Sequence, residues 1–397
     1  MIYVEEEAWA RSFKSKLDES FLTRWREEKC SIFRVPPILH SENPKAYMPR
    51  VISIGPYNRG REDLMVTEKL KHRATRYLFS RRPKYMAQCL REVRSLEKRA
   101  RSCYAEEIDM DSREFTEMMI LDGCFVISFL ISETWEKGFL KKDKDWKEIE
   151  EIYSVPLVYE DLIKVENQIP FFILQTLYDS LVLRDPNGKI TESISDLIII
   201  NFKQLEPAGD RNGTIYRNIT QVHHLLHLFY QTAASSRKSA DDFHDVNRTP
   251  SQMLKGKSDE GEGGMKVSNW MRSATELQEF GVKFLGKGDC RFSSVSFKDG
   301  VMEIPTIRIF ERTMPTLRNL IAFEQYFPDT NNEVTFFADL MDALIDTPSD
   351  VKVLKDAGIL KIGLSNTTRK GPLARKVLPR KTFSLVIVYF TDYSSNL

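Results

Sequence analysis

The stretch YEDLIKVENQIPFFILQTLYDSL, residues 159–181, carries a polar triplet between two apolar runs. The triplet is Glu166, Asn167 and Gln168. Pro170 has no backbone N–H and suits the start of a helix, so we predict a helix over 171–183 with the triplet in the preceding turn. Burying a carboxylate or an amide without partners is costly, so these side chains must be hydrogen-bonded if they are buried.

A second polar cluster, consisting of Asn319, Glu324 and Gln325, lies in the apolar run 317–327. The backbone it could serve is residues 31–56, which hold five prolines, Pro36, Pro37, Pro44, Pro49 and Pro56. Prolines oppose a continuous helix, so we predict an ordered, extended strap with one strand over 51–54.

The two polar clusters allow two interpretations. In the one we favour, their side chains satisfy backbone groups left open at helix ends and along the strap. In the alternative, Glu166 and Glu324 form a carboxylate pair that lines a pocket.

Apolar periodicity predicts helices along much of the chain. A KDG turn at 298–300 between two apolar runs predicts a β-hairpin within 291–310. We therefore expect a mainly α fold with minor β (α+β). The helices are expected within 1–30 and over 86–103, 112–131, 171–183, 222–230, 273–280, 317–327, 334–345 and 349–357.

The composition divides the chain into three parts. An N-terminal amphipathic helix, 1–30, precedes a body over 31–360. A stretch rich in Ser, Lys, Asp, Glu and Gly, 233–266, interrupts the body and is typical of a disordered surface loop. The last part, 361–397, holds seven Lys and Arg and no acid between 361 and 381.

Charge and cysteine content exclude several classes of protein. The chain has 58 Lys and Arg against 57 Asp and Glu, which argues against a nucleic-acid partner. In the charge run 91–99, acids alternate with bases, which indicates a solvated helix face. Five cysteines without a C-x-x-C motif favour a reducing, intracellular compartment.

The chain ends and the apolar runs predict no membrane segment. Three glutamates near the N-terminus are unlike a secretory signal. Glu117 and Asp122 interrupt the apolar run 115–131, which favours a buried core helix over a membrane span.

Three histidines lie close together in the predicted helix 222–230. His223 and His227 are four residues apart, the spacing of two zinc ligands on one helix face, but no third ligand follows in the sequence. A helix-packing role is the interpretation we favour. We predict no catalytic residue and no cofactor.

Several long motifs in order resemble the plant domain-of-unknown-function family 247. They are IFRVPPILHSENPKAYMPRVISIGPYNRG (32–60), MMILDGCFVISFL (118–130), YEDLIKVENQIPFFILQTLYDSL (159–181), RSATELQEFGVKF (272–284), IPTIRIFERTMPTLRNLIAFEQ (304–325) and ALIDTPSDVKVLKDAGIL (343–360).

The resemblance implies a mostly helical body and, in most relatives, one hydrophobic span near the C-terminus. It establishes no reaction, and relatives are implicated in self-incompatibility, defence or growth. This chain departs from the family after residue 360, where its basic tail resembles a truncated end without the span.

These observations together predict a non-enzymatic, membrane-proximal interaction or signalling protein of plant cells, cytoplasmic or peripheral at a membrane. The expected partner is a protein of unknown identity, and the tail 361–381 could contact an anionic membrane surface. The alternative is an enzyme of unfamiliar class with its pocket near Glu166 and Glu324.

Overall fold

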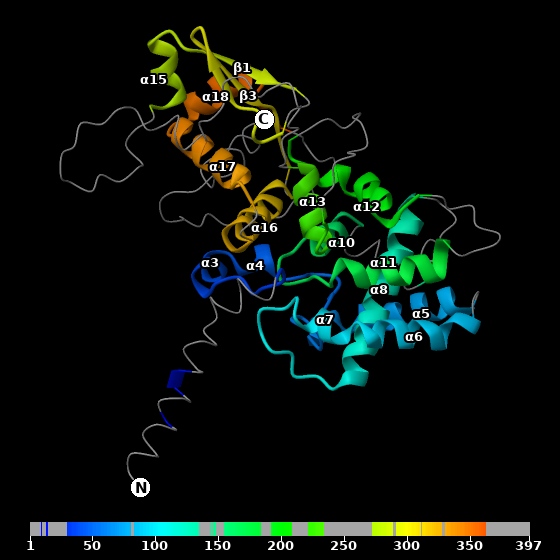
Figure 1. The fold of residues 1–397 in the computed structure, drawn as a ribbon. Helices are drawn as coiled ribbons and strands as arrows, with labels where there is room; N and C mark the ends of the chain where they lie inside the picture. The colour runs from blue at the N-terminus through cyan, green and yellow to red at the C-terminus, as the bar shows by residue number, and fades with distance from the viewer. Residues whose placement is uncertain are drawn as a thin grey trace. The chain divides into compact units, whose positions relative to one another are not determined.

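Figure 1 shows the fold of the chain as a computed structural model. The structure describes residues 30–80, 83–134, 155–183, 192–208, 221–233, 272–288, 291–310, 312–327 and 330–362, with residues 9, 13, 14, 144, 146 and 147. The chain divides into two compact units. The first comprises 1–207, 211–232 and 311–331, and the second comprises 208–210, 233–310 and 332–397.

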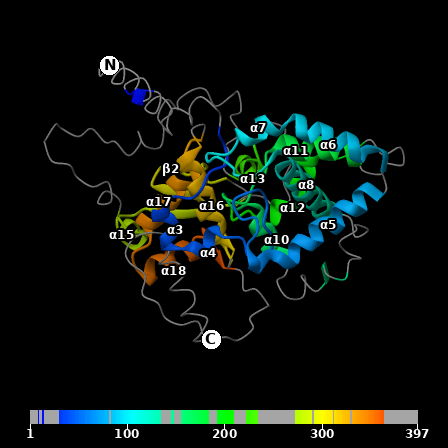
Figure 2. The same cartoon turned by 90° about the horizontal axis from the view of Figure 1, so that it is seen from below.

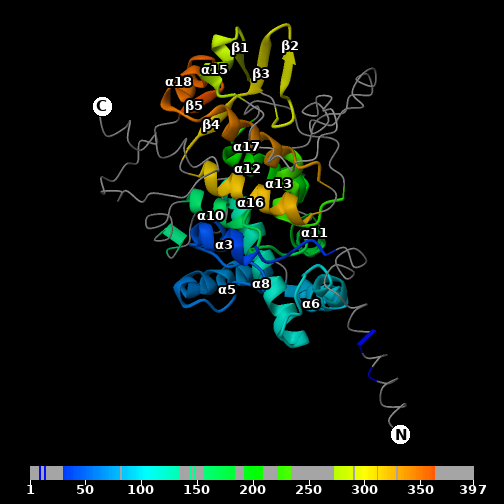
Figure 3. The ribbon, with the colours of Figure 1, turned by 90° about the vertical axis from the view of Figure 1, so that its left-hand side faces the viewer.

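The first unit is helical and is built around α8, Ser112–Thr134. Around α8 pack α5 (Met65–Ser80), α6 (Met86–Ser95), α11 (Phe171–Tyr178) and α12 (Ile194–Phe202). Figures 2 and 3 show α5 and α6 on different sides of α8. The other helices that the structure describes in this unit are α3 (Pro37–Glu42), α4 (Pro44–Tyr47), η1 (Glu62–Leu64), η2 (Pro83–Tyr85), α7 (Glu97–Arg101), α10 (Val155–Leu162), η4 (Asp179–Leu183), η5 (Lys203–Leu205), α13 (Leu225–Ala233) and α16 (Thr313–Tyr326).

The apolar run predicted to be a core helix is α8, and that prediction is confirmed. This helix is long and apolar enough to cross a membrane, but 83% of its most apolar stretch of 18 residues is buried inside the protein. Its aromatic residues join a row of rings: Phe129 lies 4.8 Å from Tyr159 and 5.6 Å from Trp146 between centroids. Such edge-to-face contacts stabilise a core beyond the area they bury.

The second unit combines helices with two small sheets. In the first sheet, β1 (Lys283–Lys287) is parallel to β3 (Val301–Pro305), and β2 (Ser296–Lys298) is antiparallel to β3. Asp299 and Gly300 have φ angles of 50° and 76°, which suit the turn that joins β2 to β3. The predicted hairpin is therefore confirmed. The parallel strand β1 and the second sheet, β4 (Ile307–Ile309) with β5 (Leu360–Ile362), were not foreseen.

The helices of the second unit are α15 (Ala274–Glu279), α17 (Glu333–Leu344) and α18 (Pro348–Asp356). Asp350 joins two of them, because its carboxylate accepts hydrogen bonds from the Thr275 amide at 2.7 Å and the Thr347 amide at 2.8 Å. Burial alone would raise the pKa of Asp350, but the hydrogen bonds from these threonines lower it to about 2.

Three expectations about local structure are wrong. Residues 51–54 form no strand, and the strap contains α3 and α4, because Pro37 and Pro44 each stand in a first helical turn, where a missing N–H costs nothing. The helix predicted over 86–103 breaks at Leu96 into α6 and α7. The helix with the histidines begins only at Leu225.

Three further expectations lie largely outside the described residues. They are the N-terminal helix within 1–30, the loop 233–266 and the tail 361–397.

Gly286 on β1 lies close to the backbone of Gly358, so a substitution at this position tests the packing of the second unit. A Cβ at this position would lie 2.3 Å from the carbonyl oxygen of Gly358. We expect Gly286→Ala to destabilise the second unit by about 1–3 kcal/mol, since backbone must shift to make room. Hydrogen exchange of the β1 and β3 amides measures this change.

The matched control is Gly288→Ala, since a Cβ there would meet nothing within 4 Å. It should change the stability by less than about 0.5 kcal/mol. Equal exchange rates in the two variants would contradict the close approach.

Candidate functional site

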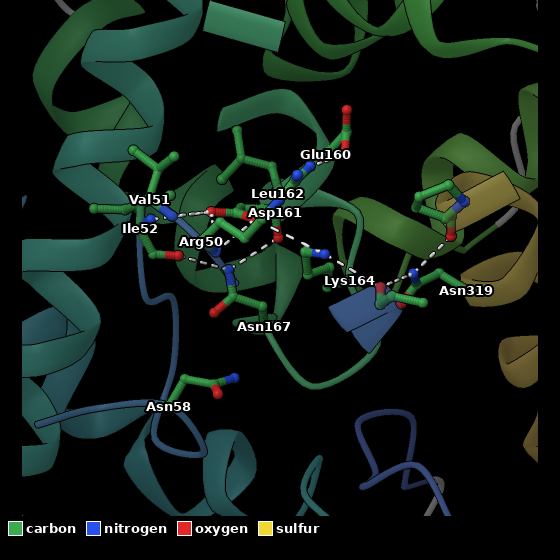
Figure 4. Close-up of polar contacts among 12 residues, drawn as sticks. Arg50, Val51, Ile52, Asn58, Glu160, Asp161, Leu162, Lys164, Asn167 and Asn319 are labelled. Carbon is green, nitrogen blue, oxygen red and sulfur yellow. Dashed lines mark hydrogen bonds and ion pairs between the residues drawn. The ribbon is translucent and has the colours of Figure 1, made fainter. Parts of the chain in front are cut away.

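A buried polar network holds residues 50–55 of the strap in the first unit. Asp161, at the end of α10, accepts three consecutive backbone N–H groups through its carboxylate. The donors are Arg50 at 2.9 Å, Val51 at 2.6 Å and Ile52 at 3.1 Å (Figure 4). Side-chain oxygens thus supply the hydrogen bonds that a neighbouring strand supplies in a sheet.

Asn167 continues the same pattern from the turn before α11. Its Oδ1 accepts the Ile54 amide at 2.7 Å. Its Nδ2 donates to the carbonyls of Ile52 at 3.0 Å and Asp161 at 2.9 Å, as Figure 4 shows. The Asn167 side chain therefore binds both a donor and an acceptor of the strap backbone.

Gly55 ends the network, with its amide 2.7 Å from Oδ2 of Asp122 on α8. Its φ angle is 77°, and a Cβ there would lie 2.3 Å from the carbonyl oxygen of Gln168. Both the conformation and the close approach require glycine at this position.

Lys71 on α5 neutralises the carboxylates at this end. Its ammonium lies 2.7 Å from Asp122, 2.6 Å from Glu68 and 3.0 Å from the Ser53 hydroxyl. Burial raises the pKa of Asp122 despite the neighbouring ammonium. Burial alone would also raise the pKa of Glu68, but Lys71 and Ser53 lower it below its ordinary value.

Lys164 has the corresponding place near Asp161. Its side chain is 1% exposed, its ammonium lies 3.9 Å from Oδ1 of Asp161, and it donates to the carbonyl of Ala46 at 3.1 Å. Burial lowers the pKa of Lys164 and raises that of Asp161. At the exposed rim, Arg50 forms an ion pair with Glu160.

Asn319 connects α16 to the same region. Its Nδ2 donates to the Ala46 carbonyl at 2.8 Å, and its Oδ1 accepts the Val165 amide at 3.0 Å. Ala46 thus receives a hydrogen bond from both Asn319 and Lys164.

Glu166 and Gln168 bind backbone at two other places. Oε1 of Glu166 accepts the Val35 amide at 2.8 Å, and Oε2 lies 3.5 Å from the Arg34 guanidinium. Burial raises the pKa of Glu166. Gln168 accepts the Leu226 amide at 3.1 Å and donates to the carbonyl of Lys164 at 2.8 Å, so it joins the turn to α13.

The remaining members of the second polar cluster lie on α16. Glu324 is buried, with 3% exposure, whereas Gln325 is exposed. The carboxylate pair of Glu324 with Glu166 stays an alternative interpretation.

The histidines pack in the core beside α16. The rings of His223 and His227 are stacked with centroids 5.0 Å apart. Nδ1 of His227 accepts the His223 amide, and Nδ1 of His224 accepts the His227 amide, each at 3.2 Å. Nε2 of His224 lies 2.9 Å from the Ser31 carbonyl, so a neutral ring with its proton on Nε2 satisfies both contacts.

The described residues contain no group of three or more His, Cys, Asp or Glu that could hold a metal ion. Nδ1 of His227 already accepts the backbone N–H of His223, which disfavours that nitrogen as a metal ligand.

The network includes charged residues that the sequence interpretation passed over. Asp161, Lys164, Lys71 and Glu68 were not singled out, and Asp122 served only as an interruption of an apolar run. The sequence pattern that marks Glu166 also marks Asp122. Each is a charged residue next to apolar runs, and such a residue must have a partner if it is buried.

These contacts define a helical protein whose ionisable core residues hold one proline-rich segment in place. The chain belongs to the DUF247 family, described as plant protein of unknown function, whose family model matches residues 32–374. The resemblance drawn from the sequence motifs is thereby confirmed.

Two proteins of Arabidopsis thaliana are similar to this chain. UPF0481 protein At3g47200 is 31% identical over 349 residues, which cover 83% of this chain and 68% of that protein. Putative UPF0481 protein At3g02645 is 23% identical over 435 residues, which cover 90% of this chain and 79% of that protein. No solved structure matches the chain.

Asp161 offers the sharpest test of the network. Asp161→Asn removes the carboxylate charge and leaves the buried Lys164 ammonium without its counter-charge. We expect the free energy of unfolding, measured in urea, to fall by about 3 kcal/mol or more.

Asp63→Asn is the control, because Asp63 pairs with Arg61 through a side chain that is 61% exposed. It should change stability by less than about 0.5 kcal/mol. A similar loss in both variants would show that Asp161 does not hold the strap.

The buried histidines predict a dependence of stability on pH. Burial and the neighbouring His223 lower the pKa of His227 to about 3. The unfolded chain, with a histidine pKa near 6.5, therefore binds more protons than the folded chain between these values, so acid destabilises the fold. His227 alone should account for a loss of about 2 kcal/mol between pH 8 and pH 5.

Two measurements check this expectation. Long-range ¹H–¹⁵N spectra should show a neutral His227 ring at pH 5. In urea, His227→Gln should unfold with a smaller pH dependence than the wild type. A charged ring in the folded protein at pH 5 would contradict the buried, neutral state.

Proposed function

We propose that this plant protein is a non-enzymatic interaction or signalling protein that works through protein contacts close to a membrane. The observation that carries the proposal is the use made of its buried polar side chains. Asp161, Asn167 and Asn319 bind backbone groups of the strap or of the turn beside it. Groups engaged in this way stabilise a surface and are not directed at a substrate.

Glu166 supports the same conclusion. A catalytic carboxylate needs an oxygen that faces the substrate. Oε1 of Glu166 accepts the Val35 amide, and Oε2 faces Arg34. This geometry favours a structural role over the alternative of an enzyme with its pocket near Glu166 and Glu324.

The membrane part of the proposal rests on the family resemblance, which implies one hydrophobic span in most members. A location in the cytoplasm or at the periphery of a membrane agrees with this part. The basic tail 361–381 would add attraction to anionic lipid.

Reciprocal capture from plant tissue tests the proposal with the full chain as bait. We expect the same protein to be recovered with the wild type and with Glu166→Gln, because glutamine keeps an acceptor for the Val35 amide. Asp161→Asn should recover less of it, since a loosened strap deforms the surface.

Two outcomes would overturn the proposal. One is that no protein is recovered above a tag-only control in either direction. The other is that Glu166→Gln abolishes the biological effect of the chain while partner recovery stays at the wild-type level, which would favour the enzyme.

A further inference from the structure

Residues 65–101, which include α5, η2, α6 and α7, differ sharply from the balanced charge of the whole chain. They contain twelve Lys and Arg but only three acids, Glu68, Glu92 and Glu97. The linear sequence of the run 91–99 shows acids between bases, which suggests local neutralisation. In the structure, the three acids are engaged within the unit, whereas several of the bases are exposed.

Each of the three acids is engaged by neighbouring side chains of the same unit. Glu68 binds Lys71 at 2.6 Å and the Ser53 hydroxyl at 2.6 Å. Glu92 accepts from Gln88 at 2.7 Å and from the Ser180 hydroxyl at 3.0 Å.

Glu97 binds Arg101 at 2.9 Å and the Ser112 hydroxyl at 2.5 Å. All three acidic residues are partly buried. The acids of this segment are thus turned toward other elements of the unit.

Three of the bases on α6 and α7 are exposed and form no ion pair described above. Arg91 and Arg94 on α6 and Lys98 on α7 are exposed, and the spacing of three residues places Arg91 and Arg94 on one side of α6. Met86 and Leu90, on the preceding turns of the same side, are 46% and 40% exposed. These five residues are called the basic strip below.

The surroundings limit the positive charge of the strip. The exposed bases Lys69 and Arg76 belong to α5, which lies on a different side of α8 from α6. Beyond α7, the exposed Glu106 and Glu107 form an acidic end.

We propose that the basic strip binds the surface of a membrane rich in anionic phospholipid. Lipid headgroups supply dense negative charge for the three bases, and the exposed aliphatic side chains can enter the boundary of the acyl chains. Nucleic acid fits less well, because single strands are bound by stacking on aromatic rings, and the strip has none. The proposal rests on the membrane part of the proposed function and assigns it to the folded body, apart from the tail.

Vesicle sedimentation tests the proposal with the full chain. The probes are vesicles of phosphatidylcholine with 30% phosphatidylserine, and vesicles of phosphatidylcholine alone. The wild type should bind only the former, and less as salt rises. Because each base near the surface contributes roughly a fivefold gain, Arg91→Glu with Arg94→Glu should lower the partition coefficient at least about 25-fold.

The matched control reverses two exposed bases of the same spacing on α18, Lys352→Glu with Lys355→Glu. This variant should keep wild-type binding. Leu90→Ser should weaken binding at high salt, where charge is screened and the apolar contact remains.

A second pair of variants separates the strip from the tail. Glutamine replaces the seven bases between 361 and 381, with and without the Arg91 and Arg94 reversal. The tail variant should still bind, and the combined variant should not.

Loss of all binding with the tail variant, or an equal loss in the α18 control, would overturn the proposal. Failure here leaves the protein partners recovered by capture unaffected, so the two proposals fall separately.

Discussion

The backbone amides of residues 51–55 are buried although these residues belong to no sheet, and the first unit depends on the side chains that bind them. A buried amide without a partner costs about 1–3 kcal/mol, so several together would offset much of the stability of a domain. Hydrogen bonds from these amides to Asp161, Asn167 and Asp122 avoid this cost. The three side chains lie on α10, in the turn before α11 and on α8. One segment of the chain thereby binds α8 and, further along the chain, α10 with the turn that follows it.

The same solution introduces buried charge. The carboxylates of Asp161 and Asp122 accept the hydrogen bonds that the carbonyl groups of a neighbouring strand would accept, so their negative charge must be neutralised. Lys164 and Lys71 supply the opposite charge from inside the unit. Buried ion pairs are weak contributors to net stability, but the loss of one partner is strongly destabilising. The network therefore specifies a single position for the strap more than it adds free energy.

The polar members of the network could be predicted only in part. Asn167, Gln168 and Asn319 stand out because amides inside apolar runs must be hydrogen-bonded. Asp161 and Lys164 lie in a short stretch of mixed polarity, where exposure is the usual expectation. Their hydrogen-bond partners, such as Val51 and Ala46, are more than 100 residues away in the sequence. A local sequence pattern does not reveal contacts at that separation.

The sequence by itself determined the features that depend on neighbouring residues. These are the buried helix α8, the Asp-Gly turn of the hairpin, the cap that starts α15 at Ser273, and the family to which the ordered motifs belong. Tertiary structure alone decided which backbone groups Asp161 serves and which way Glu92 and Glu97 face. The reason is physical: turns and caps form within a few residues, whereas the burial of a charge depends on every element that folds against it.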